Sequence, residues 1–161
     1  MIKWRKIFGN HYLGIWFLGL AFFFVQEIPY MIMPLLHLNS NPIMEMQTKF
    51  ITLDVLEKIF GSLSIAVMIL IVNGETKWFS LKDVQERVSF IGVIVTILLY
   101  FLGWGLYFGG YQSVAIMMIF LVVMPPFYYI AIGLWRKNYI LAVIGGFFLL
   151  IHFLNVMTSL L

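Results

Sequence analysis

Long apolar stretches, interrupted only at intervals by charged residues, dominate the sequence. Dividing the chain at these charges leaves five stretches near the roughly 20 residues that an α-helix needs to cross a hydrocarbon core about 30 Å thick. We predict membrane spans at residues 12–36, 55–72, 88–108, 113–135 and 139–160. The second span is the weakest, because its charge-free run begins only at Ile59. Asp54, Glu57 and Lys58 are therefore expected in its first turns, at the membrane interface. The pattern predicts an all-α, polytopic integral membrane protein: a single domain over residues 1–161, formed by a bundle of about five transmembrane helices.

The composition agrees with a chain whose solvent is lipid. Of the 161 residues, 63% are hydrophobic and 11% are charged, whereas a soluble domain is about a quarter charged. The absence of cysteine excludes thiol–disulfide chemistry, cysteine nucleophiles and thiolate zinc sites. The net charge of +3 is spread over basic residues at helix ends and forms no stripe. We therefore expect membrane lipids around the protein and no nucleic-acid partner.

Lysine and arginine in the short flanks of the spans predict their direction, because these residues gather on the cytoplasmic side. An arrangement with the N-terminus inside and the C-terminus outside leaves only Lys49 and Lys58 outside. The basic residues then inside are Lys3, Arg5, Lys6, Lys77, Lys82, Arg87, Arg136 and Lys137. A cleaved signal peptide is the alternative for the N-terminus, but the apolar run is too long and has no small-residue cleavage site. We expect a plasma membrane, and a bacterial one because organellar targeting features are lacking.

The segment 76–87, between the second and third spans, alternates charged and apolar residues and includes Trp78 and Phe79. This composition fits either a short interfacial helix or an ordinary polar connector.

Glu27 stands well inside the first predicted span, where a carboxylate is costly unless it is protonated, paired or hydrated. With a rise of 1.5 Å per residue, Glu27 lies about 22 Å from Tyr12, and His152 lies about 20 Å from Tyr139. Both residues are therefore expected at the same depth, in the outer half of the membrane. His152 shares a helix face with Asn155. This face either hydrogen-bonds across a helix interface or forms a ligand or proton site.

The third span carries a face of small and hydroxyl-bearing residues, which includes Tyr100 and Gly103. Helix packing explains the glycine better than the tyrosine. In the fourth span, Pro125 and Pro126 predict a kink that either shapes packing or lines a cavity. The candidate ligand-binding residues are Glu27, Tyr30, Tyr100, Trp104, His152 and Asn155.

A second cluster surrounds the predicted outer loop and is formed by Met31, Met33, His37, Met44 and Met46. Thioether and imidazole groups suit Cu(I), although methionine is also an ordinary apolar residue in so hydrophobic a chain. No phosphate-binding glycine loop, HExxH or GxSxG motif is present. We predict no cofactor.

Three functions fit these patterns. The leading interpretation is a small protein that binds or transports a small or lipophilic ligand in an outward-facing cavity, as a homo-oligomer or with a larger membrane partner. The second is a membrane enzyme acting on a lipid-soluble substrate, with Glu27 and His152 as an acid–base pair. The third is a non-catalytic accessory, immunity or regulatory subunit that works through helix contacts.

In size and number of spans the chain resembles the translocator-protein family, which binds porphyrins and sterols. Of that family's tryptophan- and proline-rich signature, only Pro125-Pro126 and isolated tryptophans have counterparts here, so no residue role is carried over. The resemblance implies only that a bundle this small can enclose a ligand.

Overall fold

The computed structural model describes residues 1–38 and 40–160 of the chain. In this part the chain forms five long helical segments and a small sheet, so the mainly α-helical prediction is confirmed. The strands are β1 (Ile2–Phe8), β2 (His11–Ile15) and β3 (Ile71–Asn73). The helices are α1 (Phe17–Ile32), η1 (Met33–Leu35), α2 (Pro42–Glu45), α3 (Ile51–Leu70), α4 (Val84–Phe108), α5 (Val114–Ile116), η2 (Met117–Val123), α6 (Met124–Trp135) and α7 (Tyr139–Leu160).

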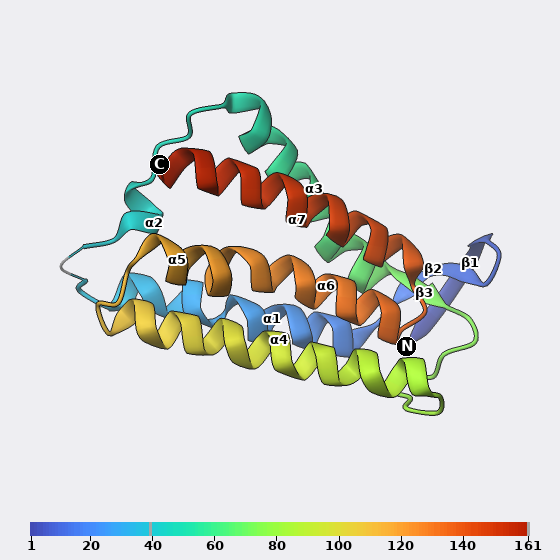
Figure 1. Ribbon diagram of the computed structural model, residues 1–161. Coiled ribbons are helices and arrows are strands. Elements are labelled where there is room, and N and C mark those ends of the chain that lie inside the picture. Colours follow the sequence, from blue (N-terminus) through green and yellow to red (C-terminus); the bar gives the residue numbers. More distant parts are fainter. Residues whose placement is uncertain (39, 161) are drawn as a thin grey trace.

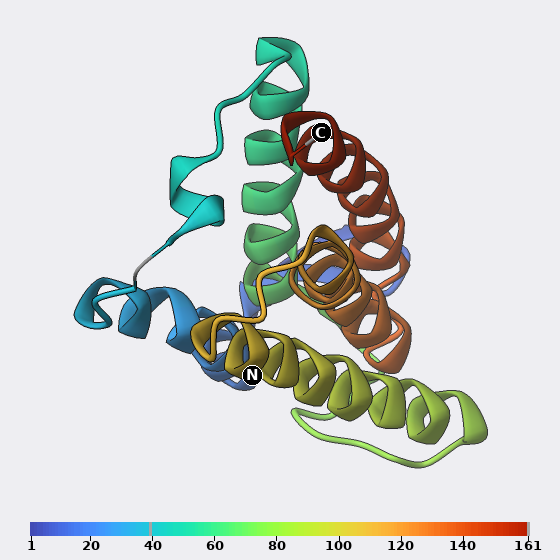
Figure 2. The same cartoon turned by 60° about the vertical axis from the view of Figure 1, so that its left-hand side comes forward.

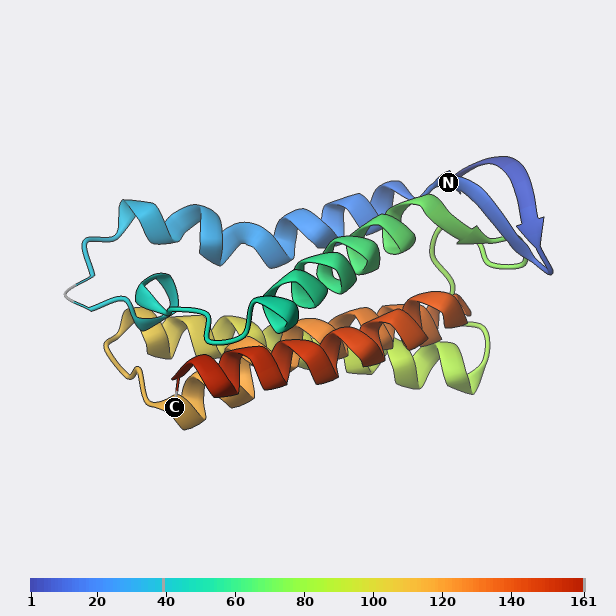
Figure 3. The same ribbon diagram turned by 90° about the horizontal axis from the view of Figure 1, so that it is seen from above.

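The long helices lie alongside one another, and the two termini lie at opposite ends of the bundle (Figure 1). α3, α7, α6 and α4 follow one another around the bundle, and each packs closely on the next (Figure 2). α1 contacts α3 and α4, but it packs less closely on both than these four helices pack on one another. The sheet projects beyond one end of the bundle (Figure 3), which we call the sheet end. The opposite end carries α2 and the C-terminus, and we call it the α2 end.

Among the described residues, four helical segments are long and apolar enough to cross a membrane, which indicates a membrane protein. They are Phe17–Leu35, Val84–Phe108, Val114–Trp135 and Tyr139–Leu160. The sequence predicts about five such segments, whereas four meet this criterion and α3 does not. α3 is long enough, with 20 residues, but Asp54, Glu57 and Lys58 interrupt its apolar character.

The sheet is a correction to the all-α prediction. Residues 12–15 were expected at the start of the first span but belong to β2, and α1 starts at Phe17. β1 and β2 form an antiparallel hairpin whose turn contains Gly9, which has a left-handed φ of 48°. β3 pairs with β2 and takes up Ile71 and Val72, the last residues of the predicted second span. The pairing joins residues about 60 positions apart, which helical periodicity does not reveal.

The possible interfacial helix at 76–87 is not formed: residues 74–83 contain no helix, and Val84 already begins α4. The connector is held over the sheet end by two indoles. Trp16 Nε1 donates to the Trp78 carbonyl at 2.9 Å, and Trp135 Nε1 donates to the Ser80 carbonyl at 2.7 Å. A helix over these residues would need their carbonyls for its own backbone ladder.

The predicted third span also begins earlier than expected, at Val84 and not at residue 88. Asp83 caps the N-terminus of α4, because its carboxylate accepts a hydrogen bond from the Glu86 amide at 2.8 Å. The segment from Val114 to Trp135 stays helical through both prolines. The turns before them, in η2, are π-helical. Such wide turns accommodate residues that cannot donate to the carbonyl four positions earlier.

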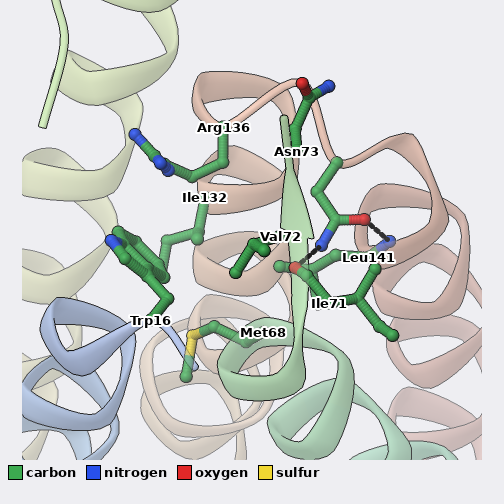
Figure 4. A pocket seen from close by; sticks show the side chains of 9 residues that line it. Trp16, Met68, Ile71, Val72, Asn73, Ile132, Arg136 and Leu141 are labelled. Carbon is green, nitrogen blue, oxygen red and sulfur yellow. Dashed lines mark hydrogen bonds between the residues drawn. The ribbon is translucent and has the colours of Figure 1, made fainter. Parts of the chain in front are cut away.

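Polar side chains tie the sheet to the turn between α6 and α7. Asn138 Nδ2 donates to the Ile71 carbonyl at 2.9 Å, and its Oδ1 accepts from the Leu141 amide at 3.3 Å (Figure 4). Arg136 lies with its guanidinium 4.8 Å from the centroid of the Trp16 ring and donates to Thr76 at 3.0 Å. Burial lowers the pKa of Arg136 to about 10, so the side chain stays charged at neutral pH. The cavity in Figure 4 measures only about 10 Å³, roughly the space of one water molecule.

Candidate functional site

A larger cavity lies among the helices, toward the α2 end, and consists of two pockets that share Tyr30, Glu57 and His152. We call the pair the Glu57 cavity. Its polar lobe has a volume of about 180 Å³ and its apolar lobe about 150 Å³. Side chains of the polar lobe come from α1, α3, α4, α6 and α7 and include Gln26, Glu27, Tyr30, Glu57, Tyr100 and His152. The apolar lobe is lined mainly by η2 and α7, through Met117, Leu121, Val122, Val156 and Leu160.

The carboxylate of Glu57 is held by two side chains of α7. His152 Nδ1 lies 3.0 Å from Glu57 Oε1, and Asn155 Nδ2 donates a hydrogen bond to Oε2. His152 and Asn155 are three residues apart, so they project from the same helix face. The imidazole also stacks on Phe148, with the ring centroids 5.1 Å apart. When His152 is protonated this contact is an ion pair between α3 and α7.

Glu27 brings a second carboxylate to the polar lobe and has no ion-pair partner within residues 1–38 and 40–160. Three further polar atoms of this lobe are buried without a hydrogen-bond partner in the described part of the chain: Gln26 Oε1, the Tyr100 hydroxyl oxygen and His152 Nδ1, which has only the ion-pair contact with Glu57. Only 6% of Gln26 and 1% of Tyr100 are exposed. Buried polar atoms are nearly always hydrogen-bonded in folded proteins, so the Gln26 and Tyr100 oxygens are available to a molecule in the cavity.

Aromatic packing supports the wall of the cavity from behind. The ring of Tyr30 meets the Trp104 ring edge-on, with the centroids 5.0 Å apart. Trp104 is buried with Tyr100 and Tyr107 in one core cluster and does not line either lobe. The Tyr107 hydroxyl donates to Asn41 Oδ1 at 2.7 Å and so holds the start of α2 against α4. This contact places α2 over the part of the apolar lobe that lies nearest the α2 end of the bundle.

The structure brings four of the six candidate residues together: Glu27, Tyr30, Tyr100 and His152 all line the polar lobe. Trp104 and Asn155 lie in the layer behind it. The residue in contact with His152 is Glu57, and no ion pair joins Glu27 to His152 among the described side chains.

Sequence reasoning missed Glu57 and Gln26 as cavity residues. Glu57 is three or four positions from Asp54 and Gly61 and shares their helix face, a signal that was present in the sequence. It was assigned to the membrane surface because the charge-free run starts only at Ile59.

The methionine and histidine residues considered for copper lie in different surroundings. Met31 and Met44 are exposed, Met33 is buried against the Tyr107 cluster, and Met46 lines the apolar lobe. His37 lines a separate surface pocket beside the 109–112 turn. In the described ranges, no three histidine, aspartate or glutamate side chains are grouped so that they could hold a metal ion.

Comparison with protein-family models finds no match for this chain, and comparisons with curated proteins and with solved structures find none either. The function is therefore argued from the chemistry of the Glu57 cavity.

Proposed function

We propose that this chain is a small integral membrane protein that binds or transports a small or lipophilic ligand in the Glu57 cavity. The observation that carries the proposal is a cavity between membrane-length helices that combines buried, unpartnered polar atoms with an apolar lobe. Sites for small molecules are typically concave and mainly apolar, with a few convergent polar groups that fix orientation. An ionisable residue inside a membrane bundle is a functional candidate by default.

The proposal includes the orientation in a bacterial plasma membrane. The hairpin, the 74–83 connector and the α6–α7 turn all lie at the sheet end and carry seven of the ten basic residues, and Arg87, an eighth, lies in the first turn of α4 at the same end. By the positive-inside rule the sheet end faces the cytoplasm. α3 then crosses as a fifth helix, with Glu57 turned into the bundle and Asp54 paired with Lys58 at 2.7 Å. The cavity lies in the outer half of the membrane in this orientation.

Binding of 1-hexanol to the purified protein in detergent tests the proposal. Apolar cavities take up small lipophilic molecules because the dry space gives them dispersion contacts. We expect saturable binding by saturation-transfer NMR and a rise in the unfolding temperature. Val122→Phe places an aromatic ring in the apolar lobe, where it fills the space for hexanol, and should abolish the saturable signal.

The matched control is Val143→Phe, because Val143 is 58% exposed on α7 and lines neither lobe. This variant should bind hexanol as the wild type does. Equal binding by Val122→Phe and Val143→Phe would show that hexanol does not occupy the cavity and would contradict the proposal.

The contact between Glu57 and His152 also supports a second candidate, an enzyme that uses this pair for acid–base chemistry on a lipid-soluble substrate. Incubation with a total lipid extract followed by mass spectrometry tests this candidate. Turnover should disappear in His152→Ala, and unchanged lipids with the wild-type protein would exclude the lipids of that extract as substrates.

A further inference from the structure

The charges of the Glu57 cavity select among ligands of similar size. The polar lobe contains the carboxylates of Glu27 and Glu57. No lysine or arginine lines either lobe in the part of the chain that the structure describes. Lys58, next to Glu57 in sequence, points its ammonium group to Asp54 and is 73% exposed. The cavity therefore has an excess of negative charge, which a protonated His152 balances for Glu57 only.

Hydrogen-bond acceptors in the polar lobe also favour a positively charged ligand. Gln26 Oε1 is an acceptor by its chemistry, and the Tyr100 hydroxyl oxygen can accept as well as donate. Both are buried without a partner among the described residues. An ammonium group has only donors, so it can pair with the Glu27 carboxylate and donate to the acceptors of this lobe.

Aromatic rings complete the polar lobe, through Tyr30, Tyr100, Tyr129 and Phe148. The face of an aromatic ring attracts a cation, and the attraction is stronger where water is excluded. The adjoining apolar lobe presents Met117, Leu121 and Val156 and has no charged lining residue besides the shared Glu57 and His152. It suits a short hydrocarbon chain.

From these observations we infer that the ligand of the Glu57 cavity is an amphipathic organic cation, with an ammonium group beside Glu27 and an apolar tail among η2 and α7. The inference rests on the proposed function, since it names the ligand class of the same cavity. An anionic ligand would add a charge to a lobe that already contains two carboxylates, and a neutral one would leave Glu27 unpaired.

Three probes with the same six-carbon tail test the inference: hexylammonium, 1-hexanol and hexanoate, titrated into the full-length protein in detergent at pH 7. We expect hexylammonium to bind at least about tenfold more tightly than hexanol, which corresponds to about 1.4 kcal/mol, and hexanoate to bind most weakly. Glu27→Gln should abolish the preference, so that hexylammonium binds about as tightly as hexanol.

Glu45→Gln is the matched control, because Glu45 is exposed in α2 and lines neither lobe. It should keep the preference for hexylammonium. Suppose that Val122→Phe abolishes hexanol binding, but hexylammonium is not preferred or Glu27→Gln has no effect on that preference. This result would overturn the cation inference and leave the proposed function standing. Hexanol binding that is insensitive to Val122→Phe would overturn the proposed function, and the inference with it. A cooperative thermal unfolding transition of Glu27→Gln, measured beside that of the wild type, shows that this variant is folded.

Discussion

Replacing Gly103 with alanine tests the closest approach between α4 and the π-helical segment η2. A Cβ atom at this position would lie 2.2 Å from Phe120 Cβ and 3.0 Å from Leu121 Cδ2. Leu121 can change its rotamer, but Phe120 Cβ is fixed to the backbone. Ordinary van der Waals contact begins at 3.4 Å. To bring the new Cβ and Phe120 Cβ from 2.2 to 3.4 Å apart, α4 and η2 must separate by about 1.2 Å.

The expected cost follows from two opposing effects. Forcing an extra carbon into a packed interface costs about 1–3 kcal/mol. Alanine in a helix gains about 0.8–1.0 kcal/mol over glycine. The difference is a net loss of about 0–2 kcal/mol. We expect the upper half of this range, about 1–2 kcal/mol, because Phe120 Cβ cannot move without the backbone; for a chain of this length this loss lowers the unfolding temperature by about 2–8 °C.

The assay is thermal unfolding in detergent, followed by tryptophan fluorescence. Gly105→Ala is the control on the same helix, because nothing lies within 4 Å of a Cβ at Gly105. It should leave the unfolding temperature unchanged or raise it. If Gly103→Ala proves as stable as Gly105→Ala, the close packing of α4 on η2 is refuted. Gly103→Ala should also weaken hexanol binding, because Leu121 lines the apolar lobe.

Two further changes probe the ends of the bundle. At the sheet end, the hydrogen bond from Lys137 to Asp83, 2.6 Å long, lowers the pKa of Asp83 and raises the pKa of Lys137. Its stabilisation is therefore present at neutral pH, is lost in acid as pH falls below the usual aspartate value of 3.8, and is lost in alkali as pH rises above the usual lysine value of 10.5. Asp83→Asn should lower the unfolding temperature at pH 7, with a difference from wild type that disappears at both extremes; a constant difference would contradict this account. At the α2 end, Tyr107→Phe removes the hydroxyl that donates to Asn41 Oδ1 at 2.7 Å, a loss of about 0.5–1.5 kcal/mol, so limited proteolysis should cut the 36–50 connection faster. Tyr111→Phe, at a residue that is 65% exposed, should be cut at the wild-type rate, and equal rates for both variants would refute the role of Tyr107.

Local sequence determined the helices. α7 begins and ends where its apolar run does, at Tyr139 and Leu160, because a helix satisfies its own backbone hydrogen bonds within one continuous segment. The sequence also predicts that Glu27 and His152 lie near each other, and both line the polar lobe. The helical rise counted from Tyr12 does not hold for residues 12–15, because these residues form β2.

Tertiary structure decided which groups meet. The pairing of β2 with β3 depends on contacts between residues about 60 positions apart, and no local pattern encodes it. The choice of Glu57 as the partner of His152 depends on how α3 packs and turns against α7. Hydrophobicity determines that a helix lies in the bundle, but side-chain packing determines its rotation about its own axis. The rotation of α3 directs Glu57, which is expected at the membrane surface, into the cavity.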